Sequence, residues 1–200
     1  MSELLASADL RLSGNVKWRQ TVPLDRPGVY IVTSSTVPES RTDGLKPEAP
    51  IDLSIVAKWI ESVPTLMLDG LHPTPEMLTE RLSHFWLPDE TVLYLGKASK
   101  SLRKRVGSYY RTTLGAPGPH AGGHWIKTLS LLDRLKVFYA SSSNPESDEN
   151  GMLAAFVRNV SSQTKILLRD PELPIPFANL EFPKGRSKNH GITGAVIRPG

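Results

Sequence analysis

Two tyrosines next to glycines, and the basic segment that follows the second one, are the residues of this sequence best suited to chemistry. The first ends Gly28–Tyr30 and the second begins Tyr94–Gly96; Arg105 follows on a basic segment, and Glu149 lies in an acidic run further along. Hydrolysis of a phosphodiester needs an activated water, a countercharge for the crowded oxyanion and a stabilised leaving group. An arginine and a carboxylate that holds a divalent ion can supply the last two. A strand tyrosine alone would more often serve packing.

The context of the second tyrosine makes the pattern specific. It reads Val92-Leu93-Tyr94-Leu95-Gly96-Lys97-Ala98, then Leu102, Arg105-Val106 and Ser108-Tyr109. With Pro27-Gly28-Val29-Tyr30 before it, this order resembles the GIY-YIG nuclease superfamily, most closely the N-terminal incision domain of bacterial nucleotide excision repair nucleases. The resemblance covers residues 27–33 and 91–180. One departure is the long segment 34–90 between the tyrosine strands, which form a short hairpin in that family. A long loop is tolerable, because its closure cost rises only logarithmically with length.

The resemblance implies roles for the matched residues. Tyr30 would hydrogen-bond or deprotonate the attacking water, and Tyr94 would be its partner. Lys97 would lower a tyrosine pKa or contact phosphate. Arg105 would neutralise the scissile phosphate, a task that suits its planar fork of donors. Tyr109 follows one helical turn later and can reach the same centre.

The resemblance also implies one divalent ion, Mg²⁺ or Mn²⁺, held by a glutamate on the helix after the third strand. Glu149 fits by its apolar neighbours, and Glu146 is the alternative one turn earlier. Acidic residues in a first helical turn are also favoured by the helix dipole alone. Asn179 resembles the asparagine that completes the motif set, although buried turn asparagines are common.

The distribution of charge favours a polyanionic partner, which we expect to be DNA. The net charge is +4, from 24 basic and 20 acidic residues, and no acidic residue lies between Glu90 and Asp133 or after Glu181. Neutralising phosphates releases counterions and drives binding, whereas the alternative is a solvated basic face. The expected contacts to the nucleic-acid backbone are Lys100, Arg103, Lys104, Arg111, Lys184, Arg186 and Lys188, with one of His120 and His124. Otherwise those histidines are loop surface or caps, and the same two interpretations apply to His190.

The composition excludes several other classes. The sequence has no cysteine, so disulfides and thiolate metal sites are excluded and a reducing cytoplasm is the expected location. No apolar run approaches the ~18 residues of a membrane span. The first residues, Met1–Leu12, lack the apolar core of a signal peptide.

Periodicity and turn signals predict the elements that must position these residues. We expect strands over Val29–Thr33, Thr91–Leu95 and Leu135–Ala140. Residues 1–24 are an irregular arm with a short strand around Val16–Val22. Helices are expected after the caps Asp52 and Thr74, then over Lys100–Thr113, Trp125–Leu132 and Asp148–Val160. The tail from Pro171 is expected to wrap the domain without regular structure.

Together these elements predict one α+β domain over residues 1–200: a small three-stranded antiparallel sheet flanked by helices, with a mostly helical insertion at 34–90. The insertion is acidic, so it suits a protein partner, cleft shaping or extra core better than a DNA clamp. The leading hypothesis is a metal-dependent DNA endonuclease. The alternatives are a catalytically inactive nucleic-acid-binding or protein-interaction module with the same fold, and a structural protein with a basic face.

Overall fold

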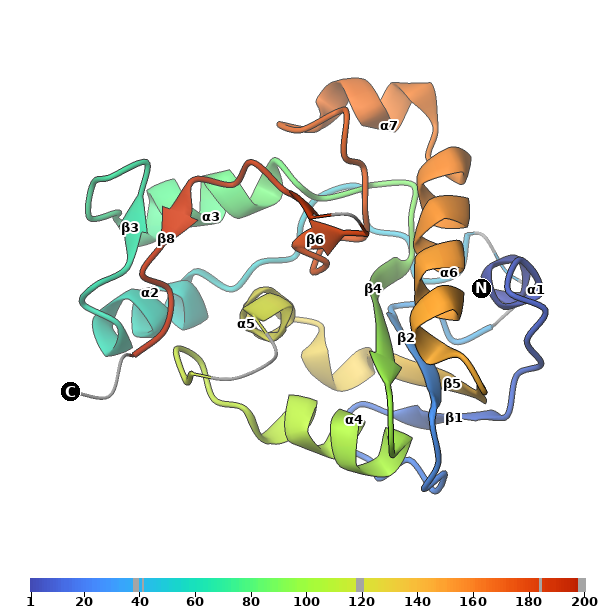
Figure 1. The fold of residues 1–200 in the computed structure, drawn as a ribbon. Coiled ribbons are helices and arrows are strands. Elements are labelled where there is room, and N and C mark those ends of the chain that lie inside the picture. The colour runs from blue at the N-terminus through green and yellow to red at the C-terminus, as the bar shows by residue number, and fades with distance from the viewer. Residues whose placement is uncertain (38–39, 41, 118–120, 184, 198–200) are drawn as a thin grey trace.

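The fold is α+β, as the strand and helix signals predicted (Figure 1). The computed structural model describes residues 1–37, 40, 42–117, 121–183 and 185–197. Its main sheet has four antiparallel strands in the order β1-β5-β2-β4. These are β1 (Gly14–Lys17), β2 (Gly28–Thr33), β4 (Val92–Ala98) and β5 (Lys136–Ser141). The expectation of three strands was wrong by one, because the N-terminal arm adds β1 along the free side of β5.

The two tyrosine strands, β2 and β4, pair directly even though residues 34–90 separate them in sequence. Strand β4 runs on to Ala98, beyond Gly96 where we expected it to end. Gly96 lies opposite Tyr30, and a Cβ at Gly96 would lie 2.6 Å from Cε1 of Tyr94 and 2.7 Å from Cζ of Tyr30. The glycine therefore belongs to the strand and leaves the space that both aromatic rings occupy.

Helices cover both faces of the sheet, so every residue of β2 is buried. Val29 and Ile31 pack in a core with residues of α1 (Ser2–Ala6) and α6 (Pro145–Asn159). Tyr30 and Val32 pack in a second core with residues of α4 (Leu102–Arg111) and α5 (Ala121–Lys127). A strand buried on both faces reads as a continuous apolar run rather than an alternating one.

The segment between the tyrosine strands shares the second core. It contains α2 (Leu53–Ser62), β3 (Met67–Leu68) and α3 (Pro75–Ser83), and Figure 1 shows it beside the C-terminal tail. Asp52 and Thr74 cap the two helices as predicted, since each side chain accepts from backbone N–H groups of the first turn. Strand β3 pairs with β8 (Ile192–Thr193). Trp59 Nε1 donates to the Ala195 carbonyl at 3.2 Å, which ties the segment to the tail.

Three helix predictions differ from the structure. The helix expected over Trp125–Leu132 begins earlier, as α5, and ends at Lys127, with a short 3-10 turn η1 (Leu132–Arg134) after it. Its early glycines argue against helix by propensity, but Gly122 is needed there because a Cβ would collide with the backbone carbonyl of Ala178. Helix α6 begins at Pro145, which suits the first helical position. Helix α1 lies in the arm expected to be irregular.

The C-terminal tail contains more regular structure than expected. After α7 (Ser162–Leu167) it forms a small hairpin of β6 (Glu181–Phe182) and β7 (Arg186–Ser187), and then β8. No helix in the described part of the chain is both long and apolar enough to cross a membrane.

Candidate active site

Three tyrosines meet on the face of the sheet that α4 covers. The rings of Tyr94 and Tyr109 stack with centroids 5.2 Å apart and planes 21° apart. The Tyr30 ring lies 5.8 Å from that of Tyr94 and 6.2 Å from that of Tyr109. Strand β2 carries Tyr30, its neighbour β4 carries Tyr94, and α4 carries Tyr109. The fold therefore assembles the three phenols that the sequence analysis grouped.

Arg105 lies one helical turn before Tyr109, and its charge affects the pKa of all three tyrosines. Burial raises the pKa of Tyr30 and of Tyr109 well above the ordinary tyrosine value, and the Arg105 guanidinium opposes that shift in both. Burial also raises the pKa of Tyr94, the Glu149 carboxylate raises it further, and Arg105 again lowers it. All three phenols are therefore neutral at pH 7, with one cation close enough to act on each.

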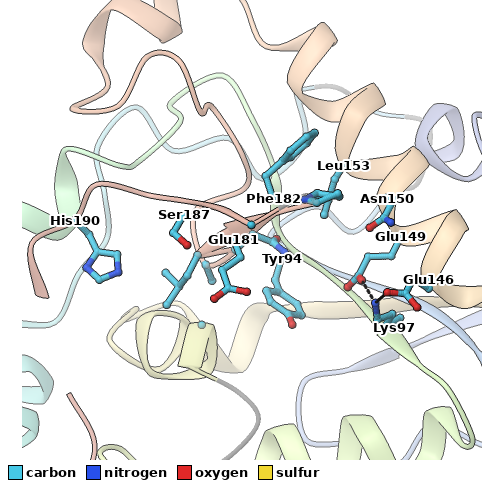
Figure 2. A pocket seen from close by; sticks show the side chains of 16 residues that line it. Tyr94, Lys97, Glu146, Glu149, Asn150, Leu153, Glu181, Phe182, Ser187 and His190 are labelled. Carbon is cyan, nitrogen blue, oxygen red and sulfur yellow. Dashed lines mark ion pairs between the residues drawn. The ribbon is translucent and has the colours of Figure 1, made fainter. Parts of the chain in front are cut away.

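The opposite side of β4 carries an ion-pair cluster. Lys97 Nζ lies 3.2 Å from Glu146 Oε1 and 3.3 Å from Glu149 Oε2, as the dashed lines in Figure 2 mark. The Glu149 side chain is 15% exposed and that of Glu146 is 76% exposed. Burial raises the pKa of Glu149, against the lowering effects of Lys97 and Arg105. Burial lowers the pKa of Lys97, but the two carboxylates outweigh it and the net shift is upward.

A pocket of about 680 Å³ lies over the edge of β4, where the two faces of the sheet meet. Four predicted site residues line it: Tyr94, Lys97, Glu149 and Asn179. Figure 2 shows Lys97 with its carboxylates at one end of the pocket and His190 at the other. Tyr30 is fully buried behind this wall, at 0% exposure. Tyr94 is thus the phenol that a molecule in the pocket can reach most directly.

Asn179 fastens the tail to the edge of the sheet. Its Oδ1 accepts from the Leu95 N–H at 2.8 Å, and its Nδ2 donates to the Leu95 carbonyl at 2.8 Å. The neighbouring Ala178 N–H donates to the Leu93 carbonyl at 2.8 Å. Strand β4 is the last strand of the sheet, so the tail covers its otherwise unpaired backbone groups. Both ends of the Asn179 amide are hydrogen-bonded to the backbone of Leu95, so this residue holds the tail in place as one wall of the pocket.

Two residues expected to contact phosphate are buried instead. Lys188 is 5% exposed, and its Nζ donates to the carbonyls of Pro176 and Phe177, each at 2.8 Å. His124 is 2% exposed, with its ring 5.5 Å from that of Trp59. These positions correct the expectation of a surface role at both residues, because charge and spacing do not reveal burial.

The other expected backbone contacts lie at the surface or outside the described residues. The exposed ones are Lys100, Arg103, Lys104, Arg111 and Arg186. His120 and Lys184 lie outside the described part of the chain. DNA contact by the exposed residues stays a prediction.

The pocket also contains residues that the sequence analysis did not assign to it. They come from α6 and the tail: Asn150, Leu153, Glu181, Phe182 and Ser187. Asn150 and Leu153 share the helix of Glu149, so helical spacing could have identified them. The tail residues gave no periodic signal, because the hairpin that carries them has strands of only two residues.

Comparison with known proteins gives one partial similarity. No protein-family model matches the sequence, and no solved structure matches it with significance. The chain is 34% identical over 82 residues to UvrABC system protein C of Pseudomonas syringae pv. tomato. The matched stretch is 41% of this chain and 12% of that protein, so the chain covers only a small part of its relative's length. The chain is therefore similar, in part and at a distance, to UvrABC system protein C.

Proposed function

We propose that this chain is a metal-dependent endonuclease of the GIY-YIG type that hydrolyses DNA phosphodiester bonds. The observation that carries the proposal is that Tyr94 and Glu149 line one pocket and Arg105 lies close enough to lower the pKa of both, although the three residues come from a strand and two helices. A phenol, a guanidinium and a mostly buried carboxylate can supply the activated water and the countercharge that phosphodiester hydrolysis requires. The partial similarity to UvrABC system protein C supports the same reading, since the motif order resembles incision domains of bacterial repair nucleases.

Glu149 suits a single divalent ion, Mg²⁺ or Mn²⁺. Its carboxylate lines an open pocket, and Mg²⁺ is commonly held by one or two carboxylates, with water and substrate phosphates completing its shell. Among the described residues no group of three or more His, Asp or Glu side chains could enclose an ion. Glu149, the more buried of the two glutamates from α6 that line the pocket, would be the principal protein ligand. Such an ion polarises a phosphoryl oxygen and lowers the pKa of bound water.

Tyr94 is better placed than Tyr30 to orient the attacking water. The family resemblance implies this role for Tyr30, whose ring is fully buried. Tyr94, in contrast, lines the pocket and lies close enough to Glu149 for the carboxylate to raise the pKa of the phenol. A neutral phenol can accept a hydrogen bond from water while donating its own proton elsewhere. Tyr30 and Tyr109 hold the Tyr94 ring by packing against it.

Arg105 would supply the countercharge for the pentacoordinate transition state at phosphorus. Its charge reaches Tyr94 and Glu149, so a phosphate between those two groups would lie within its field. Lys97 holds Glu149 in place through the ion pair and lowers the pKa of the carboxyl against the larger, raising effect of burial. Removing one such preorganised charge typically slows the chemical step by ~100-fold or more.

Cleavage assays test this function directly. Supercoiled plasmid, branched DNA and RNA are incubated with the protein and Mg²⁺, Mn²⁺ or EDTA. We expect metal-dependent nicking by the wild type and loss of ~100-fold or more in Arg105→Ala and Glu149→Gln. Arg158→Ala and Glu61→Gln remove the same charges at exposed positions on α6 and α2, and should cleave like the wild type.

Two results would contradict the enzyme. Activity that survives both site substitutions would place the chemistry elsewhere or in a contaminant. Tight DNA binding without cleavage under any metal condition would favour the inactive binding module instead. A protein partner for the acidic segment 34–90 stays a separate prediction, which pull-down with the full chain and with charge-reversed variants of that segment would test.

A further inference from the structure

A second pocket lies on the other side of α4 from the candidate active site. Its volume is about 360 Å³, and it is lined by Arg19, Thr21, Arg103, Gly107, Tyr110 and Arg111. Three of its six lining residues are arginines and none is acidic. The connection between β1 and β2 contributes Arg19 and Thr21, and α4 contributes the rest.

Helical spacing separates the two faces of α4. Arg103, Gly107 and Arg111 follow one another at intervals of four and so lie on one stripe. Arg105 and Tyr109 form a second stripe, which a turn of 100° per residue places on the opposite side of the helix. One helix therefore presents a cation to the tyrosine cluster and two cations to the second pocket.

Gly107 makes room for the arginine side chains of the second pocket. A Cβ at this position would lie 3.1 Å from Nη1 of Arg111, closer than side chains normally approach. Glycine within a helix costs about 1 kcal/mol relative to alanine. The absent side chain leaves the guanidinium folded over the helix surface, where it borders the pocket.

Neighbouring groups neutralise this positive charge only in part. Arg19 pairs with Asp133 at 3.7 Å, but the side chains are 68% and 86% exposed, and such pairs contribute little. Arg103 donates from Nη2 to the Pro23 carbonyl at 2.8 Å. Asp25 is near enough to Arg103 for the arginine to lower its pKa, but its main partner is the Ser101 hydroxyl.

The pocket wall also contains a polar group that lacks a partner. The Tyr110 hydroxyl is buried and has no hydrogen-bond partner within the described part of the chain. The ring is held by Trp18, whose centroid is 4.8 Å away. Burial raises the pKa of Tyr110 well above the ordinary tyrosine value, so the group remains a neutral donor. The guanidinium donors that line this pocket suit a ligand with several anionic acceptor oxygens.

We propose that this second pocket binds a backbone phosphate of the DNA substrate that flanks the phosphate at Arg105. The inference rests on the proposed function for its ligand, but not on catalysis. A helix with side chains is about 10–12 Å across, and a strand advances ~3.4 Å per nucleotide. Measured along the duplex axis, the two phosphates would therefore be about three nucleotides apart on a strand that runs past α4. The pocket would set the register of the strand relative to the candidate active site.

Binding without cleavage separates the inference from the proposed function. All variants are made in the Glu149→Gln background, and a fluorescent DNA duplex is titrated in EDTA over a range of NaCl concentrations. We expect Arg19→Ala and Arg111→Ala each to weaken binding about tenfold and to reduce the salt slope by about one. Gly107→Leu should weaken binding similarly while leaving thermal stability unchanged or higher, because leucine favours helix and fills the pocket.

The control is Arg158→Ala, an exposed arginine on α6 outside the pocket, which should leave affinity and salt slope unchanged. The inference is wrong if the three pocket variants bind like this control while remaining folded by circular dichroism. A second measurement titrates inorganic phosphate and follows the Arg19 and Arg111 side-chain signals by nuclear magnetic resonance. If phosphate shifts these signals but the variants bind DNA normally, the pocket binds a free anion and the inference is also wrong. Normal binding by wild type with no cleavage overturns only the proposed function.

Discussion

The side-chain amide of Asn179 makes a pair of 2.8 Å hydrogen bonds with both backbone groups of Leu95. Because β4 is the last strand of the sheet, this amide pairs with backbone groups that no further strand pairs with. Leu95 is next to Tyr94, so this contact fixes the strand that carries the pocket's phenol. The family resemblance places Asn179 in the catalytic set, but here both ends of its amide hydrogen-bond to the backbone of β4.

Asn179→Ala should lower the free energy of unfolding by about 2–4 kcal/mol, because two buried backbone groups lose their partners. Urea denaturation measures this loss, and hydrogen exchange should show faster exchange at the Leu95 amide. The exposed Asn159→Ala on α6 is the control. An unchanged exchange rate at Leu95 would contradict the role of the contact.

Tyr94→Phe and Tyr30→Phe should affect activity differently. If Tyr94 orients the water, its loss should slow single-turnover cleavage by about 100-fold or more. Tyr30→Phe keeps the buried ring and should have a smaller effect on the rate. Equal losses in both variants, or a larger loss in Tyr30→Phe, would return the role to Tyr30.

Binding of Mn²⁺ should distinguish the two candidate carboxylates. Both carboxylates line the pocket, but the side chain of Glu149 is mostly buried, whereas that of Glu146 is largely exposed. Calorimetric or electron paramagnetic resonance titrations should show Mn²⁺ binding lost in Glu149→Gln and retained in Glu146→Gln. The reverse pattern would assign the ion to Glu146. Both outcomes are measured as metal binding, independently of nuclease activity.

His124 should make the protein less stable in acid. Burial is the main reason that the pKa of His124 falls from 6.5 to about 4. Below pH 6.5 the unfolded chain takes up a proton that the folded chain does not, so stability falls until about pH 4. The expected loss is about 2–3 kcal/mol, measured by urea denaturation at pH 7.5 and 4.5.

The His124→Gln variant should show a smaller loss between these pH values. Some loss should remain, because burial also lowers the pKa of His190. The exposed His72→Gln is the matched control and should keep the wild-type pH dependence. A His124→Gln variant as acid-sensitive as the wild type would contradict this assignment.

The sequence by itself determined the local pieces of the site. The run from Tyr94 to Tyr109 specifies a strand, a turn and an amphipathic helix, because side-chain periodicity depends only on local geometry. The caps Asp52 and Thr74 were predictable for the same reason, since each acts within its own first turn. The spacing of Arg105 and Tyr109 likewise requires them to share one helical face.

The tertiary structure alone decided which polar groups face a pocket. Lys188 and Lys97 are both lysines on basic stretches, yet one is buried against carbonyls and the other joins two carboxylates at the pocket. Glu149 and Glu146 are one turn apart on one helix, and only long-range packing makes the first more buried. Burial depends on segments distant in sequence, such as the tail that Asn179 anchors. Local pattern therefore identifies the chemistry a residue can perform, and packing determines whether a substrate can reach it.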